Sequence, residues 1–507
     1  MSKLQNVNNT MTSDIHSKTT REITSRQLSA NSGAQSLMAV SMAWMDSLYD
    51  HDRRMLRHPD QPKQHMVRES LWYALGLVFE SLQTGERDAR IKRVVEIVSN
   101  VLACQYNTPG KIWHGTFKRA PQEADPPDGA VIWKDYDPNW RQFVGTILLL
   151  LRRLEGHLVL TRLVPAIDAA LIRCIEGEPV NRVPPGYTNI ALMKAWLEIE
   201  AGDLVDASIQ ARGLSYAHKI REGFCKHNAF AEYNSPTYYG INFFALGLWQ
   251  NFSDDLEEMG REINKHLWAD VARFYHAGMK NLCGPWSRSY GMDMQRYVSA
   301  LSLWVWAVTE KSVAPFPQST RDLVHGHDFC LGPIAAFSAV DIDPGIKERL
   351  TSFEQSQIVS QQISFDPLRK AEAYLSPNLM IGLESSSRSF HGTDQYHPLT
   401  IHWLKSDNAV GWCRLRFKGS TVGSLNQNTL NLKFTADPQV TSASLQFSDC
   451  IRLDALSVSS DGLTMTLETG CQLEADANNL TITFPNSLRE NAVSIICKVD
   501  DQGLARS

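Results

Sequence analysis

The residues best suited to chemistry gather in one short stretch, Glu232–Gly240. It contains a carboxylate (Glu232), an amide (Asn234) and two adjacent phenols (Tyr238 and Tyr239), more hydrogen-bonding capacity than the start of a helix requires. Groups of these types form hydrogen bonds to a ligand, and the carboxylate and the phenols can also act as general acids or bases. We therefore interpret the stretch as part of an active site. The alternative, in which Asn234 only caps a helix and the tyrosines only pack, stays open at this point.

A helix must position this stretch. Ser235 followed by Pro236 marks a helix start, because a serine side chain accepts a free backbone N–H and proline at the first helical position loses no hydrogen bond. The segment that follows, Ile241–Trp249, is almost entirely apolar, so we expect a helix that is buried on all sides. The positive, N–H-bearing end of that helix would face whatever binds in the pocket.

Similar polar helix starts recur at Asp135–Asn139, Gly186–Asn189 and Ser289–Met294. Measured at Asn139, Asn189, Tyr239 and Met294, the four starts are 50, 50 and 55 residues apart. A period of this length that holds two helices predicts a stack or closed ring of helical hairpins. Every repeat then opens in the same direction, so the four starts are expected to meet in one cavity.

The candidate site residues follow from these starts. The predicted catalytic residues are Glu232, Asn234, Tyr238, Tyr239, Arg288 and Tyr290. The predicted substrate-binding residues are Asp135, Tyr136, Asn139, Arg141, Tyr187, Asn189 and Asp293, with His114 reaching in from a long connection and His397 from the C-terminal part. A phenol has an unperturbed pKa of about 10, so a tyrosine that acts as a base needs a nearby cation such as Arg288 or Arg141.

The wider pattern predicts an α+β multidomain protein. Apolar residues recur three or four apart in Leu71–Leu82, Ile91–Leu102, Trp140–Leu154, Leu163–Ile175, Ile190–Ile199, Ile209–Phe224, Ile241–Trp249, Ile263–Leu282 and Tyr297–Val308. From about Leu379 the period becomes two, which is typical of antiparallel strands. We therefore expect a disordered tail (1–34), an (α/α) toroid of helical hairpins (35–313), a connection (314–378) with an exposed turn at Val324–Asp328, and an antiparallel β-sandwich or sheet domain (379–507).

Composition excludes several function classes. The 507 residues are 43% hydrophobic and 21% charged with a net charge of -5, so neither nucleic acid nor a membrane is an expected partner. Nine cysteines without a CxxC pair indicate reduced thiols, and the start of the sequence lacks an apolar signal region, so we expect a cytoplasmic protein. We expect no cofactor, because phosphate-loop, GxGxxG and GxSxG motifs are missing. We also expect no metal, because His397 and His402 would face opposite sides of a strand.

Four segments carry a resemblance to a known group of enzymes: Glu232–Tyr239, Arg288–Asp293, Tyr374–Gly382 and Asp394–Trp403. With the helical-hairpin and β-domain order, they resemble the chondroitin AC/alginate lyase and heparinase II/III-like superfamily of polysaccharide lyases. The resemblance implies β-elimination on a uronate-containing oligosaccharide or a related acidic small molecule. It also implies Asn234 as the group that neutralises the substrate carboxylate, and Tyr238 or Tyr239 as base or acid.

Two other functions fit the same residues. A carboxylate pair such as Glu232 with Asp135 or Asp293 would suit glycoside hydrolysis, or the dehydration or cyclisation of a natural product. A carboxyl separation of about 5 to 5.5 Å is typical of retaining glycosidases and about 6.5 to 9.5 Å of inverting ones. A non-catalytic carbohydrate-binding module is the third possibility, in which the tyrosines only close the helix ends.

Overall fold

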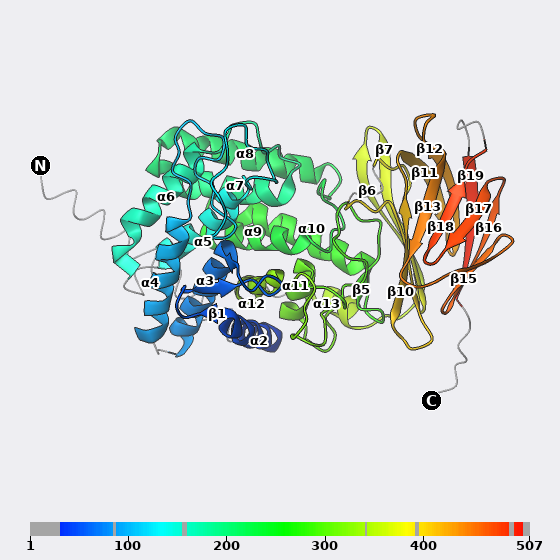
Figure 1. The fold of residues 1–507 in the computed structure, drawn as a ribbon, viewed down its shortest axis with the longest axis horizontal. Coiled ribbons are helices and arrows are strands. Elements are labelled where there is room, and N and C mark those ends of the chain that lie inside the picture. Colours follow the sequence, from blue (N-terminus) through cyan, green and yellow to red (C-terminus); the bar gives the residue numbers. More distant parts are fainter. Residues whose placement is uncertain are drawn as a thin grey trace, which may run out of the picture. The chain divides into compact units, whose positions relative to one another are not determined.

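The computed structural model describes residues 31–84, 88–154, 160–339, 342–390, 395–485 and 491–499. They form two compact units, and each is built from three separate stretches of the chain. The helical unit comprises residues up to 223, 240–264 and 298–339, and the sandwich unit comprises 224–239, 265–297 and the described residues from 342 onward. The expected α+β class is confirmed, with helices in the N-terminal part and antiparallel sheets in the C-terminal half (Figure 1).

The helical unit alternates helices with long connections. Its elements are α2 (Ser32–Leu48), a small sheet of β1 (Tyr49–Asp50), β2 (Met55–Arg57) and β3 (His65–Met66), α3 (Val67–Thr84), α4 (Asp88–Ala103), α5 (Trp140–Leu154), η2 (Leu160–Arg162), α6 (Val164–Glu176), α7 (Thr188–Ala201), η3 (Gly202–Leu204), α8 (Ala207–Cys225), α9 (Tyr239–Phe252), α10 (Glu257–Phe274), α11 (Ala300–Val308), η4 (Gly326–Leu331) and α12 (Gly332–Ser338). Some residues of α8, α9 and α10 belong to the sandwich unit.

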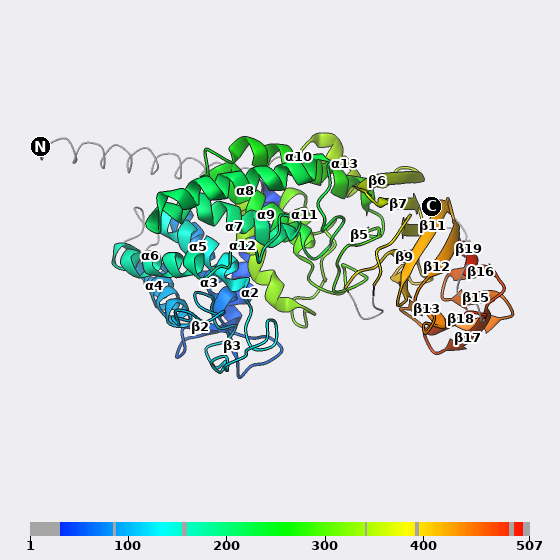
Figure 2. The same ribbon diagram turned by 90° about the horizontal axis from the view of Figure 1, so that it is seen from above.

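Helix α9 is the buried helix that its apolar sequence predicts. Phe244 and Leu248 of α9 meet Leu75 of α3, Leu150 of α5 and Phe337 of α12 around a small apolar gap. Figures 1 and 2 both show α9 among α5, α7, α11 and α12. A helix with so few polar residues is stable in such a place because, up to Trp249, almost none of its surface meets water.

The sandwich unit contains two antiparallel sheets, the hairpin of β4 (Tyr275–His276) and β5 (Asn281–Leu282), and helix α13 (Pro344–Thr351). Within the described residues, the larger sheet has eight strands in the order β17-β18-β13-β10-β9-β8-β7-β6 and the smaller has six in the order β11-β12-β19-β16-β15-β14. Their bounds are β6 (Gln357–Phe365), β7 (Leu368–Ser376), β8 (Leu379–Glu384), β9 (Leu399–Leu404), β10 (Val410–Arg416), β11 (Ser420–Asn426), β12 (Thr429–Thr435), β13 (Ser442–Phe447), β14 (Arg452–Asp454), β15 (Ser457–Ser460), β16 (Leu463–Thr469), β17 (Gln472–Asp476), β18 (Asn479–Thr483) and β19 (Asn491–Val499).

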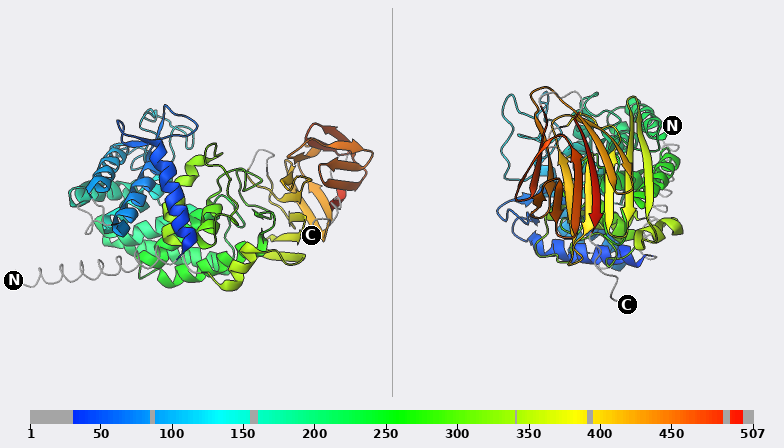
Figure 3. Two further views of the ribbon diagram at one scale, coloured as in Figure 1. Left: turned by 90° about the horizontal axis from the view of Figure 1, so that it is seen from below. Right: turned by 90° about the vertical axis from the view of Figure 1, so that its right-hand side faces the viewer.

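The two sheets share one hydrophobic core. Ile381 and Leu415 of the larger sheet belong to the same buried cluster as Leu432 and Ile495 of the smaller one. Buried and exposed residues alternate along β12, as expected of a strand with one face in a core and one in water. Figure 3 shows the strands side by side in its right-hand view. This sandwich is one of the two arrangements that the alternating pattern predicts.

Strands β8 and β9 are buried along almost their whole length, because the segment after β5 lies against them. The backbone N–H of Gly284 donates to Thr400 Oγ1 of β9 at 3.1 Å. A Cβ placed on Gly382 of β8 would lie 2.0 Å from the carbonyl carbon of Gly284, so glycine at 382 permits this close approach of two backbones. Farther along, Trp286 and His397 exchange backbone hydrogen bonds of 2.9 and 3.0 Å.

Several predicted boundaries differ from the structure. Strands β6 and β7 lie inside the stretch predicted as a connection; β6 is an edge strand with mostly half-exposed residues, so its apolar alternation is weak. Helix α10 ends at Phe274 instead of continuing to Leu282, because the chain turns there into the β4–β5 hairpin. At the N-terminus, α2 begins at Ser32, within the expected tail, and residues 1–30 of that tail lie outside the described residues.

The cysteines and the hydrophobicity of the helices can be compared with what the sequence predicts. All nine cysteines are free thiols, as their spacing indicates. None of the helices in the described ranges combines the length and the hydrophobicity that crossing a bilayer requires.

Candidate functional site

Four of the predicted catalytic residues meet around one guanidinium group in the sandwich unit. Arg288 donates through Nη1 to Glu232 Oε1 (3.0 Å), through Nη2 to the Tyr238 hydroxyl (2.7 Å) and through Nε to Gln395 Oε1 (3.1 Å). The hydroxyls of Tyr238 and Tyr290 lie 2.8 Å apart. We call these five residues the Arg288 cluster. It joins a cation, a carboxylate and two phenols from three distant parts of the sequence.

The Arg288 cluster is partly open to solvent. The side chain of Arg288 is 29% exposed and Tyr290 is 38% exposed. The guanidinium also lies 3.9 Å from the centroid of the Tyr238 ring, a cation–π contact that fixes its orientation. Both the guanidinium and the Tyr290 phenol are therefore accessible from solvent.

The Tyr238 phenol is protonated at neutral pH. Burial raises its pKa well above the ordinary value, the neighbouring Tyr290 raises it further, and Arg288 only partly opposes this. Of the two roles that the sequence left open for Tyr238, base or acid, its raised pKa therefore favours the acid. In this state Tyr238 is equipped to donate a proton.

Hydrogen bonds of Ser235 and Thr237 hold together the two segments that carry the cluster. The Ser235 hydroxyl accepts the Tyr238 N–H at 3.0 Å, as expected of a serine at a helix start, and donates to the Arg288 carbonyl at 2.7 Å. Thr237 Oγ1 accepts the Tyr290 N–H at 3.2 Å. Residues about 50 apart in sequence are thus held in register by two hydroxyl groups.

Asn234 and Tyr239 support this backbone instead of facing a substrate, which corrects their predicted roles. The Asn234 side-chain amide donates both hydrogens, to the carbonyls of Cys283 (2.7 Å) and Pro285 (2.8 Å). Its backbone N–H donates to the Tyr239 hydroxyl at 2.6 Å, and Tyr239 is 1% exposed. With both amide hydrogens committed, Asn234 cannot neutralise a substrate carboxylate.

A buried carboxylate anchors the same segment to the larger sheet. Glu384, at the end of β8 and 0% exposed, accepts the hydroxyls of Tyr233 and Tyr396 and pairs with Arg369 Nε at 2.5 Å. Tyr233 directly precedes Asn234, so this network fixes the start of the stretch that presents Tyr238. We call these four residues the Glu384 anchor.

His397 and Asp293, two predicted substrate-binding residues of the sandwich unit, are buried at 1% and 5% exposure. Burial, assisted by Arg414 and Arg416, lowers the pKa of His397 to about 3, so the imidazole is neutral. Its Nε2 lies 3.4 Å from the Ser289 carbonyl. Asp293 Oδ1 accepts the Gln295 N–H at 2.9 Å, as in a turn cap. Both side chains are therefore buried and contact only the protein's own backbone groups, so neither presents an open binding surface.

Asp270 of α10 gives the sandwich unit a pH-dependent stability. Burial raises the pKa of this carboxyl to about 7, and Arg273 at 3.3 Å opposes the shift without cancelling it. The folded state therefore keeps a proton that the unfolded chain releases near pH 4, and this contribution to stability is lost as the pH rises toward about 7.

We predict that Asp270→Asn removes this loss. The variant should gain stability relative to the natural protein as the pH rises from 5 to 8, by up to about 3 kcal/mol. Urea unfolding of both proteins across this pH range measures the difference. A stability difference that does not change with pH would show that Asp270 titrates normally.

In the helical unit, the starts of α5 and α7 meet as predicted. Asn139 Nδ2 donates to the Tyr187 hydroxyl at 2.7 Å, and Arg182 Nη1 donates to Asn139 Oδ1 at 2.7 Å. Arg182 also pairs with Glu178 at 2.6 Å. Asn189, on the first turn of α7, is 1% exposed. The predicted convergence of polar helix starts thus holds for this pair.

The other candidates of the helical unit build the long loop before α5. Arg141 is 0% exposed and donates to the backbone carbonyls of Ile112 (2.8 Å) and His114 (2.7 and 2.9 Å). His114 Nδ1 accepts the Thr108 N–H at 3.1 Å. These bonds leave Arg141 no role as a substrate ligand, which corrects its predicted function.

Tyr136 and Asp135 belong to the same loop. Tyr136 is 2% exposed and packs on Trp113 with ring centroids 6.2 Å apart. Asp135 Oδ2 accepts the Val131 N–H at 2.8 Å. Both side chains therefore stabilise the long connection from which His114 was predicted to reach the site, which corrects their predicted role as substrate ligands.

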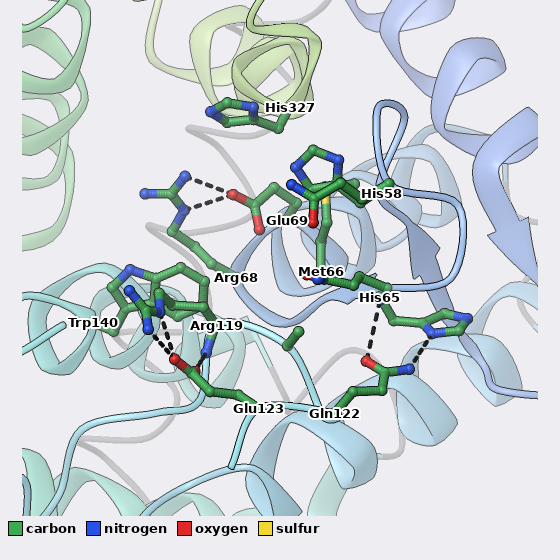
Figure 4. A pocket seen from close by; sticks show the side chains of 13 residues that line it. His58, His65, Met66, Arg68, Glu69, Arg119, Gln122, Glu123, Trp140 and His327 are labelled. Carbon is green, nitrogen blue, oxygen red and sulfur yellow. Dashed lines mark hydrogen bonds and ion pairs between the residues drawn. The ribbon is translucent and has the colours of Figure 1, made fainter. Parts of the chain in front are cut away.

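A hollow lies at the starts of α3 and α5, and the sequence pattern did not predict it. It has a volume of about 420 Å³ and is lined by residues that include His58, Arg68, Glu69, Arg119, Trp140 and His327 (Figure 4). We call it the His327 hollow. Its signal in the sequence is the pair of histidines that flank Gly326, which were interpreted only as part of an exposed turn. In the described part of the chain, no group of three or more His, Cys, Asp or Glu side chains is placed to hold a metal ion.

Fold and site together define a two-unit α+β protein, in which helices precede an antiparallel sandwich and a phenol–guanidinium cluster lies in the sandwich unit. The chain belongs to the DUF8769 family, a domain of unknown function, which matches residues 35–340. No curated protein matches the chain.

Proposed function

We propose that this protein is a lyase that catalyses β-elimination on a uronate-containing oligosaccharide or a related acidic small molecule. The observation that carries the proposal is the Arg288 guanidinium bonded to the Tyr238 hydroxyl, which is paired in turn with the Tyr290 hydroxyl. β-Elimination requires a cation for the carboxylate, a base for the α-proton and an acid for the leaving oxygen. The Arg288 cluster contains groups of all three kinds.

Each residue has a role in this proposal. Arg288 binds the uronate carboxylate and stabilises the negative charge that develops when the α-proton leaves. Tyr290 is the base that takes that proton, and Tyr238 gives its proton to the leaving oxygen as the carbon–oxygen bond breaks. Their shared hydrogen bond of 2.8 Å then passes the proton from Tyr290 back to Tyr238 and resets the pair. Glu232 and Gln395 hold the guanidinium in place.

The architecture supports the same assignment. Helix α5 packs against both α3 and α7, and the starts of α5 and α7 are bonded to each other. This is the arrangement of neighbouring hairpins in an (α/α) toroid, so we propose a toroid for the helical unit. With the four sequence segments described above, it supports membership of the heparinase II/III-like superfamily as part of the proposal.

The two alternatives receive less support. Glycoside hydrolysis needs a pair of working carboxyls, but Glu232 is bonded to Arg288 and Asp293 caps a turn. In the Arg288 cluster, the hydroxyls of Tyr238 and Tyr290 are hydrogen-bonded to each other, and Arg288 bonds to both Tyr238 and Glu232. A carbohydrate-binding module would not need this arrangement.

The direct test is to incubate the purified full chain with a panel of uronate oligosaccharides and to follow ultraviolet absorbance for the unsaturated product. We expect absorbance to rise with at least one member of the panel. A flat trace with every member, at enzyme concentrations sufficient for slow turnover, would contradict the proposal and favour the carboxylate-based alternatives.

A further inference from the structure

We infer that the His327 hollow of the helical unit binds an uncharged sugar ring through the Arg68–Glu69 pair, His327 and Trp140. This inference does not rest on the proposed elimination, because it concerns binding within the helical unit alone.

The Arg68–Glu69 pair offers one uncommitted donor next to one uncommitted acceptor. Arg68 donates through Nε (2.9 Å) and Nη2 (2.6 Å) to a single oxygen of Glu69, Oε1. Among the described residues, neither Arg68 Nη1 nor Glu69 Oε2 has a hydrogen-bond partner, although Glu69 is only 4% exposed. Figure 4 shows Arg68 Nη1 pointing away from Glu69, with no bond drawn to it. Both atoms keep some accessible surface, so a ligand in the hollow can bond to them.

His327 adds a third uncommitted atom. Its Nδ1 is buried and has no hydrogen-bond partner in the described part of the chain, and the residue lines the hollow with Arg68 and Glu69 (Figure 4). A sugar hydroxyl both donates and accepts. Neighbouring hydroxyls of one ring can therefore accept from Arg68 and donate to Glu69, and a small rotation of the His327 ring would bring its Nδ1 to a third hydroxyl.

Charge decides between a neutral and an anionic ligand. Each arginine of the hollow is compensated by an adjacent glutamate: Arg68 by Glu69, and Arg119 by Glu123, whose Oε1 accepts from Arg119 Nε at 2.6 Å. In addition, the free oxygen of Glu69 lies beside the Arg68 guanidinium and would repel a phosphate or a carboxylate. An uncharged polyhydroxylated ligand fits this balance.

Size and surface agree with a sugar. The volume of about 420 Å³ lies within the range of small-molecule sites, roughly 300 to 1,000 Å³. Trp140 lines the hollow, and the Arg68 guanidinium lies 5.1 Å from its ring centroid. The hollow therefore places an apolar ring beside a hydrogen-bond donor, and a sugar needs both. The less polar face of a sugar ring can pack on such an indole.

The test is isothermal titration of the full chain with glucose, galactose and mannose, and separately with glucuronate and glucose 6-phosphate. We expect at least one neutral hexose to bind with a Kd of about 1 mM or below, and both anions to bind at least tenfold more weakly. Absence of binding by all three neutral hexoses, or tighter binding of either anion, would overturn the inference.

Two variants locate the binding. Glu69→Gln is expected to weaken hexose affinity at least tenfold, because it removes the charged acceptor. Since Glu69 is buried and this variant can lose its fold, His327→Ala provides the second measurement and should weaken binding at least threefold. His51→Ala, an equivalent change at an exposed histidine outside the hollow, should leave affinity unchanged. Unchanged hexose affinity in His327→Ala would place the sugar elsewhere.

Discussion

Tyr238→Phe is expected to lower kcat by at least about 100-fold while the protein stays folded, because general acid–base groups typically contribute factors of this size. The change removes only a hydroxyl, so the ring that packs on Arg288 at 3.9 Å remains. It removes the proton donor for the leaving oxygen and the partner through which Tyr290 is reset. Initial rates of unsaturated product formation, measured on the best substrate of the uronate panel, provide the comparison.

Tyr239→Phe is the matched control. It also removes one tyrosine hydroxyl from the same helix start, but that hydroxyl accepts only a backbone N–H of Asn234 in the fold described. We expect it to reduce stability by about 1 to 3 kcal/mol and to leave the rate within a few-fold at temperatures where the protein is folded. If Tyr239→Phe lost turnover and Tyr238→Phe kept it, the assignment of the proton donor would be wrong. Retained substrate binding with no effect of either change would favour a non-catalytic module.

The second large effect concerns stability. Glu384→Ala should lower the free energy of unfolding by about 3 kcal/mol or more, because removing one partner of a buried ion pair leaves the other uncompensated. Arg369 would lose its carboxylate, and the Tyr233 and Tyr396 hydroxyls would lose their common acceptor. Urea unfolding monitored by tryptophan fluorescence measures the change.

Glu474→Ala provides the comparison for this prediction. Glu474 lies on an exposed position of strand β17, so the same substitution there should change stability by no more than about 0.5 kcal/mol. Equal effects of the two substitutions would show that the Glu384 anchor contributes nothing beyond a surface carboxylate.

The sequence predicted the long helices well because their apolar period is strong. The bounds expected for α5 are those observed, and the buried character of α9 follows from a segment without a polar face. Edge strand β6 was missed because half-exposed residues blur the alternation. The β4–β5 hairpin was missed because Tyr275–Leu282 continues the apolar spacing of α10 across a turn.

The site was predictable only in part, for a physical reason. Local composition identified Glu232, Tyr238, Arg288 and Tyr290, which the structure brings together. It could not tell a phenol that faces a substrate from one that accepts a backbone N–H, since Tyr238 and Tyr239 are adjacent and identical in type. That distinction depends on which side of the helix start each ring occupies.

Hydrogen-bond partners that are far apart in the chain could not be predicted from the sequence. Glu384 is 151 residues from Tyr233 and Gln395 is 107 residues from Arg288, with no spacing rule to connect them. The His327 hollow likewise depends on residues near 68, 140 and 327 that meet only after folding.

The discontinuous course of the sandwich unit has a consequence for how this protein can be divided or inherited. Its first two stretches, 224–239 and 265–297, fall inside the family match that ends at residue 340, whereas Glu384 and Gln395 lie beyond it. A recombination event at that boundary would separate Arg288 and Tyr233 from the side chains that hold them. Residues 35–340, which match the family as one segment, therefore carry a complete Arg288 cluster only when the C-terminal sheets are inherited together with them.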